Sequence, residues 1–97
     1  MQYAYIFRKY KSSMNPVHTE SEIQAASMKA VEAMYGSNID NFKIRTLLPF
    51  PNEQKREAWD VQVTFLLNGL QHTVDLLINE KDGIITNARL IDTMVPL

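Results

Sequence analysis

An asparagine–glycine dipeptide between two alternating runs of residues constrains the fold of this chain most. The dipeptide is Asn68-Gly69. Both residues of a two-residue hairpin loop must take positive φ, which asparagine and glycine tolerate. Pairing outward from this loop sets Trp59 opposite Ile78, and every residue on that face is apolar except His72. A shift of one residue would exchange the two faces, so the sequence predicts one register with one core face.

A second turn signal, Asp82-Gly83, predicts a further strand after this hairpin. A strict two-residue loop there would turn Arg89 toward the core. A three-residue loop over 81–83, with Gly83 in the left-handed position of a bulge, avoids this and sets Arg89 opposite Asp75 on the outer face. The same loop predicts three residues on the core face: Thr86, Ala88 and Leu90.

One helix is expected over about 20–35. Thr19 and Glu22 have the spacing of a capping box, in which each side chain accepts a hydrogen bond from the other residue's backbone N–H. Gly36 ends the pattern. Helical spacing predicts an inner stripe of mostly small residues, which lets the helix lie close to a sheet. These are Ile23, Ala26, Ser27, Ala30, Ala33 and Met34.

The remaining segments complete a single α+β domain over 1–97. Aromatic and β-branched residues favour a strand over 2–10, a run too short to exclude a helix. Alternation predicts another strand over 42–48, ended by Pro49-Phe50-Pro51. The expected fold is one helix on a four- to five-stranded antiparallel meander sheet, with the order strand, helix, then four strands. Its parts are 1–18 (strand and loop), 19–36 (helix), 41–92 (meander sheet) and 93–97 (tail).

Composition narrows the functional classes. The chain has 97 residues, no cysteine and a formal net charge of −1. The charge argues against a nucleic-acid partner, although Arg8, Lys9 and Lys11 make the N-terminus locally basic. No apolar run approaches the ~20 residues of a membrane span, so we expect a cytoplasmic protein. Without thiolates, and with no histidine or carboxylate spacing typical of a metal site, we expect neither metal nor cofactor.

No catalytic residue is predicted from the polar side chains. His72 on the core face is a candidate ligand or acid–base group, weighed against a rim histidine with one satisfied nitrogen. Asp60 and Asp75 share the outer face. Such a carboxylate pair can act in acid–base catalysis only inside a desolvated pocket, and an open sheet face predicts cross-strand ion pairing with Arg89 instead.

The more informative candidates are apolar residues expected on the outer face. A cluster of such residues with a polar rim marks an association surface, and we expect the chain to bind itself as a homodimer or to bind another protein. The alternatives are that these residues scatter singly or that the tail folds over them. The candidate interface residues are Leu47, Leu66, Leu77, Ile85 and Ile91, together with Phe50 between its two prolines.

The order of elements resembles that of cystatin-like folds. The last half also resembles PepSY-type domains, through Trp59-Val61-Val63, Gly69, Val74-Leu76-Ile78-Asn79 and Gly83 before Ile84-Ile85. The resemblance implies peptidase inhibition or a binding role. The chain departs from the inhibitory pattern: residues 49–57 replace the Gln-x-Val-x-Gly hairpin, and no tryptophan follows Pro96.

Three functions therefore stand as expectations from the sequence. The first is a small non-enzymatic binding or assembly module that acts through protein–protein contact. The second is a small-ligand-binding protein or enzyme with a pocket between helix and sheet, lined by Tyr35, His72 and Trp59. The third is a peptidase-inhibitor-like domain.

Overall fold

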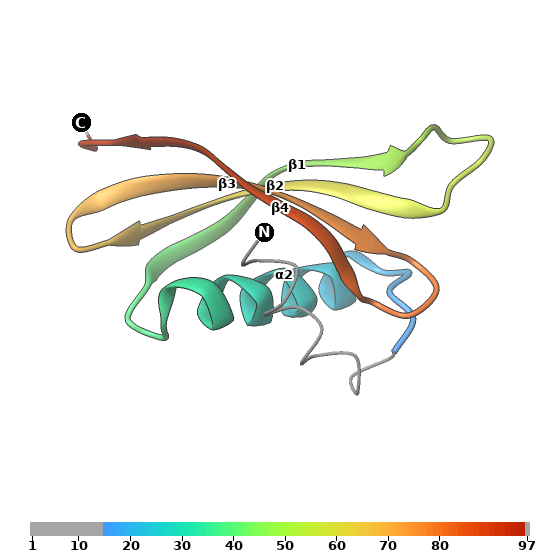
Figure 1. Ribbon diagram of the computed structural model, residues 1–97, viewed down its shortest axis with the longest axis horizontal. Coiled ribbons are helices and arrows are strands. Elements are labelled where there is room, and N and C mark those ends of the chain that lie inside the picture. The colour runs from blue at the N-terminus through green and yellow to red at the C-terminus, as the bar shows by residue number, and fades with distance from the viewer. Residues whose placement is uncertain (1–14, 97) are drawn as a thin grey trace.

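The computed structural model describes residues 15–96, in which one helix covers one face of an antiparallel sheet (Figure 1). The strands lie in the order β1-β2-β3-β4, so each pairs with its neighbour in the chain. The α+β meander is thus confirmed with four strands, and the strand or helix considered for 2–10 lies outside the described residues. The elements are α2 (Glu20–Tyr35), β1 (Asp40–Phe50), β2 (Ala58–Leu67), β3 (Leu70–Asn79) and β4 (Ile85–Met94).

Helix α2 begins with the predicted capping box. The Glu22 backbone N–H donates to the Thr19 hydroxyl over 3.2 Å, and the Thr19 N–H donates to the Glu22 carboxylate over 3.0 Å. Both satisfy donors that have no partner within the helix. The helix ends at Gly36, whose φ is +90°. Its buried residues are Ile23, Ser27, Ala30 and Val31.

The β2–β3 hairpin has the register predicted from its loop. Asn68 and Gly69 both have positive φ, and Trp59 lies opposite Ile78 as expected. Burial alternates along β2 because successive side chains point to opposite faces. The core under α2 is built mainly from this hairpin, with six side chains no more than 1% exposed: Val61, Val63, Phe65, Val74, Leu76 and Ile78.

The β3–β4 connection differs by one residue from the prediction. The Asn79 N–H donates to the Ile84 carbonyl, so the loop holds four residues, 80–83, rather than three. Gly83 has the expected positive φ of 73°. Beyond the turn, Arg89 lies opposite Asp75 as predicted.

The extra loop residue changes which side chain enters the core at the start of β4. Ile85, not Thr86, pairs with Ile78, and the register shifts before Asn87 pairs with Leu77. At such an irregularity the strand gains one residue, so the inward-facing residue is followed by two outward-facing residues instead of one. Ile85 is only 8% exposed, so its predicted place on the outer face is wrong.

Strand β1 is longer than predicted and also irregular. It continues through Pro49, which lies opposite Trp59 on an edge strand, where a missing N–H breaks no ladder hydrogen bond. The register shifts between Ile44 and Thr46. Leu47 therefore pairs with the buried Val61 and packs against the core, so its predicted outward position is also wrong.

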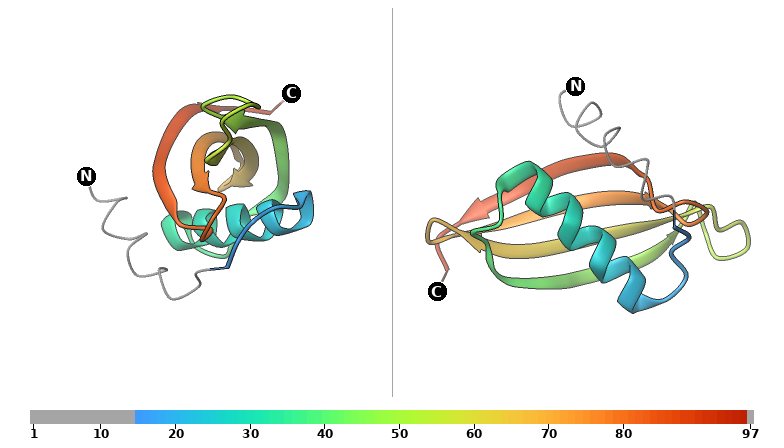
Figure 2. Two further views of the ribbon diagram at one scale, coloured as in Figure 1. Left: turned by 90° about the vertical axis from the view of Figure 1, so that its right-hand side faces the viewer. Right: turned by 90° about the horizontal axis from the view of Figure 1, so that it is seen from below.

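The sheet is strongly twisted, and its edge strands do not lie flat. Seen along the molecule, β1 and β4 curve to the side away from α2, around the central hairpin (Figure 2, left). Strand β4 extends to Met94, so Thr93 and Met94 belong to the sheet and not to the predicted tail. Within residues 15–96, no helix is long and apolar enough to cross a membrane.

Candidate functional site

The candidate site is the outer face of the sheet, by which we mean the face turned away from α2. Three large apolar side chains are exposed there at the ends of the edge strands. Leu48 and Phe50 on β1 are 59% and 44% exposed, and Met94 on β4 is 48% exposed. Each pairs with an outer-face residue of β2 or β3. The ends of this face are therefore apolar and accessible.

Three of the predicted interface residues fit this face. Leu66 and Leu77 belong to it by alternation and are half-buried, whereas Phe50 is exposed. Ile91 is 44% exposed and has no partner where the β4 register shifts, so strand pairing assigns it to neither face. Leu47 and Ile85 do not belong to the face.

Sequence reasoning missed Leu48 and Met94. Strict alternation placed Leu48 inside, because the irregularity before Thr46 leaves no mark in the residue pattern. Met94 fell in the predicted tail, although an apolar residue so close to the last strand was an available signal.

The centre of the outer face carries two neighbouring carboxyl groups, Asp60 and Asp75. Desolvation raises the pKa of Asp75 to about 6, assisted by a hydrogen bond with Asp60 and by that residue's negative charge, while Arg89 acts in the opposite direction. The Asp60 Oδ1 atom is buried and has no hydrogen-bond partner. Nearby Thr73 is only 3% exposed, so side chains exclude water from this part of the face.

The ion pair expected between Asp75 and Arg89 is confirmed in its strand register but not as a salt bridge. Arg89 lies opposite Asp75, but the salt bridges among residues 15–96 do not include this pair. The neighbouring Asp60 raises the pKa of Asp75 more than Arg89 lowers it. Asp60 and Asp75 are both half-buried, so the centre of this face is less solvated than its ends.

His72 lies in an aromatic cluster at one end of the core. Its ring stacks on Phe65 with centroids 5.3 Å apart and meets the Tyr35 ring edge-on at 5.6 Å. One ring nitrogen, Nδ1, lies 3.2 Å from the Leu70 carbonyl oxygen. These contacts favour the packed rim histidine over a free acid–base group.

Trp59 lies far from that cluster. It is six residues before Phe65 on the same strand, which corresponds to roughly 20 Å. Its indole N–H donates to the Val17 carbonyl over 2.9 Å, and the Arg56 guanidinium lies 4.5 Å from the ring centroid. The three residues expected to line one ligand pocket therefore do not converge.

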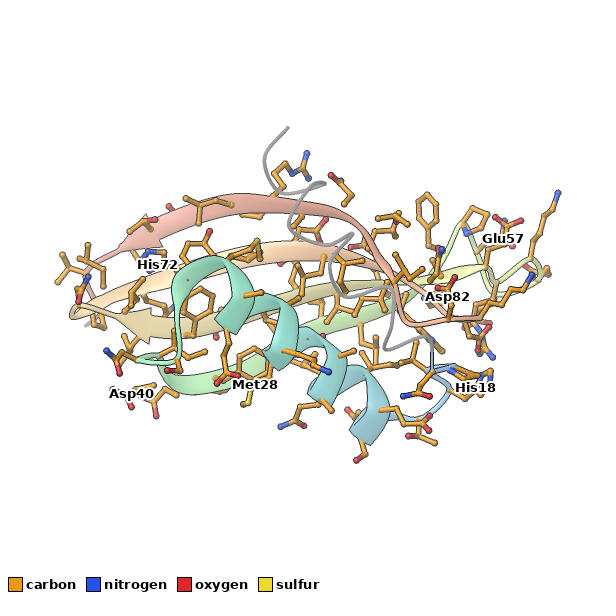
Figure 3. The ribbon with its side chains drawn as sticks, turned by 60° about the horizontal axis from the view of Figure 1, so that its bottom comes forward. His18, Met28, Asp40, Glu57, His72 and Asp82 are labelled. Carbon is orange, nitrogen blue, oxygen red and sulfur yellow. The ribbon has the colours of Figure 1, made fainter. Side chains whose placement is uncertain are left out.

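A polar cluster at the Trp59 end joins three loops. The Glu80 carboxylate pairs with the Arg56 guanidinium and with His18 Nδ1 at 3.1 Å. The hydrogen bond from Arg56 is the main reason that the pKa of Glu80 is lowered, and His18 adds to it. Figure 3 shows His18 at this end of the molecule and His72 at the other. The two histidines cannot act on one ligand.

Neither metal coordination nor a known relative points to another site. No group of three or more potential ligands that could hold a metal occurs among residues 15–96. No family model matches the chain, and no curated protein or solved structure does. The resemblance to cystatin-like and PepSY-type domains thus gains no support from these comparisons, and the site must be interpreted from its own chemistry.

Proposed function

We propose that this chain is a non-enzymatic protein-binding module that forms a homodimer through the outer face of its sheet. The observation that carries the proposal is the exposure of Leu48, Phe50 and Met94 on that face. Apolar side chains gathered around a polar centre characterise association surfaces, since association removes them from water. Leu66 and Leu77 extend the apolar area without being fully exposed.

The size of the face suits a second copy of the chain. Four strands about 4.8 Å apart, with about ten residues at 3.3 Å each, span roughly 19 by 33 Å, or some 600 Å² before side chains are counted. A stable interface removes about 800 Å² from each partner. The flat area of the face is therefore about three quarters of what a stable interface removes from each partner.

The charges on the face also suit self-association. Asp60 and Asp75 lie at the centre, while Lys43 on β1 and Arg89 on β4 belong to the same face at its two edges. In a two-fold interface the same patch meets itself, so a patch of one sign would repel its copy. A face that carries both signs can pair acids of one copy with bases of the other.

The alternatives receive less support. The ligand-binding function depended on one pocket lined by Tyr35, His72 and Trp59, but these residues lie at two ends of the core. The groove between α2 and the β3–β4 turn is lined by other residues. Peptidase inhibition depended on a resemblance whose motifs this chain lacks.

Sedimentation velocity over a range of concentrations tests the proposal. We expect the wild-type chain to dimerise, and Leu48→Glu or Phe50→Glu to raise the dimer dissociation constant at least about tenfold, since a charge would be buried at the interface. Leu70→Glu is the matched control, because Leu70 is 37% exposed but lies at the hairpin tip on the opposite side of the sheet. A monomeric wild type, or equal weakening by the control, contradicts the proposal.

A further inference from the structure

A groove lies on the helix-covered side of the sheet, between α2 and the β3–β4 turn. Its volume is about 580 Å³, within the range of about 300–1,000 Å³ that is typical of sites for small organic molecules. The helix crosses the sheet diagonally, so its N-terminal half diverges from β4 (Figure 2, right). Alanine side chains on that half leave the space unfilled and give the groove an apolar floor. The floor residues are Val17, Ala25, Ala26, Ala30 and Ile85.

Two carboxylates, Glu22 and Asp82, line this groove. Glu22 Oε1 accepts hydrogen bonds from the backbone N–H groups of His18 and Thr19 over 2.8 and 3.0 Å. These bonds hold the pKa of Glu22 below its usual value, so the group is ionised at neutral pH. Asp82 Oδ1 accepts from the Ile84 N–H over 3.0 Å. Backbone donors therefore position both carboxylates, and neither belongs to a salt bridge among residues 15–96.

The charges of the groove are separated along its length. Residues 15–18 cross from the β3–β4 turn to the start of α2, so Asp82 and Glu22 lie toward the same end of the groove. Lys29 also lines the groove, but it follows Glu22 by about two helical turns, or about 10 Å along the helix axis. The groove therefore has an acidic end that continues into an apolar floor.

We propose that this groove binds a small primary amine with an apolar body, whose ammonium group contacts Glu22 and Asp82. An ammonium group carries one positive charge and three N–H donors, which suit two carboxylates that have no cationic partner among residues 15–96. The apolar body removes the alanine floor from water. A bare metal ion fits less well, because no group of three or more potential ligands occurs in the described part of the chain.

Titrations followed by NMR test the ligand class with three probes that differ in one group. The probes are phenethylamine, phenethyl alcohol and hydrocinnamate, which are cationic, neutral and anionic at neutral pH. We expect millimolar phenethylamine to shift the amide signals of the groove residues and to bind at least about threefold more tightly than the alcohol, with hydrocinnamate weakest. Equal binding of the three probes, tightest binding of hydrocinnamate, or no shifts with phenethylamine overturns the proposal.

Substitutions that remove charge locate the ammonium group. Glu22→Gln and Asp82→Asn each keep the oxygen that accepts backbone hydrogen bonds, so the helix cap and the turn stay intact. The double variant should bind phenethylamine at least about threefold more weakly than the wild type does, and no more tightly than it binds the alcohol. Glu20→Gln/Glu32→Gln is the matched control, since it removes two exposed charges of α2 outside the groove. Equal weakening in both variants, or in neither, contradicts the site.

Filling the groove tests its location independently of charge. Ala25 is exposed and lines the groove, so Ala25→Phe adds a large side chain there without disturbing the core and should abolish binding. Gln24→Phe, on the neighbouring exposed position outside the groove, should bind like the wild type. The opposite pattern refutes the site.

Two further measurements separate the amine site from the proposed dimer. Leu48→Glu, on the outer face, should bind phenethylamine like the wild type, since the groove lies on the other side of the sheet. Dilution of the ligand-free chain should leave the amide signals of the groove unchanged. Shifts of these signals on dilution would assign the groove to a second copy and overturn the amine site.

Discussion

Ser27 is fully buried between α2 and the sheet, and its hydroxyl has no hydrogen-bond partner. A small residue is needed here because the helix lies directly over the core of the hairpin. Removing an unsatisfied hydroxyl is favourable, and alanine is the better helix former. Spacing alone predicted that Ser27 faces inward, but it could not predict that the hydroxyl finds no acceptor, which depends on the final packing.

Replacing this residue tests the packing of the helix. We predict that Ser27→Ala raises the free energy of unfolding by roughly 0.5–1 kcal/mol, measured by urea denaturation. Ser21→Ala, on the exposed first turn, should change it by less than about 0.5 kcal/mol. A clear loss of stability in Ser27→Ala would show that the hydroxyl has a partner after all.

The raised pKa of Asp75 leads to a second prediction at the scale of single residues. With a pKa of about 6 in the folded state against 3.8 in the unfolded chain, the folded state holds the proton more tightly. The contribution to stability is therefore complete below about pH 4 and is lost as the pH rises through 6. We predict that wild-type stability declines over this window and that Asp75→Asn flattens the decline.

The measurement is urea denaturation of both chains at several pH values between 4 and 8. Asp92→Asn, which neutralises an exposed carboxylate on β4, is the matched control and should leave the decline in place. If Asp75→Asn and the wild type keep parallel profiles, the carboxyl pair does not titrate as described.

At the scale of elements, turn and cap chemistry was predictable from sequence and strand irregularities were not. Asn68-Gly69 determined the central hairpin, since its two positive φ values allow one type of loop. In contrast, the predicted faces of Leu47 and Ile85 were wrong, because each residue lies next to a register shift. A period of two in the sequence contains no information about where one residue is added.

At the scale of elements, a testable feature is the way in which Glu80 joins three loops through its contacts with Arg56 and His18. Its pKa is lowered by Arg56 and His18, so its contribution to stability is present above the usual value of 4.5 and is lost as the pH falls through the lower folded value. We predict that Glu80→Gln lowers stability at pH 7 by on the order of 0.5–1 kcal/mol, and that the difference disappears in acid.

Thermal and urea denaturation at pH 7 and near pH 3 check this prediction. Glu53→Gln, in the same region but exposed, is the control and should change little. A Glu80→Gln variant that is as stable as the wild type at neutral pH would mean that the three loops are held by backbone contacts alone.

At the scale of the whole molecule, α2 covers one face of the sheet and leaves the other face open. The outer face has exposed apolar ends and charges of both signs, which suit a second copy. The sequence indicated association through this face, with three residues that fit it, but the outward positions of Leu48 and Met94 depend on strand pairing that the residue pattern does not contain.

Isotope-filtered NMR on an equimolar mixture of labelled and unlabelled chains tests the proposed dimer most directly. It detects contacts between protons of different copies, at concentrations well above micromolar. We predict intermolecular contacts from Leu48, Phe50 and Met94, and none from the exposed side of α2. A sample without intermolecular contacts, or a dimer whose contacts all come from α2, would contradict association through the outer sheet face.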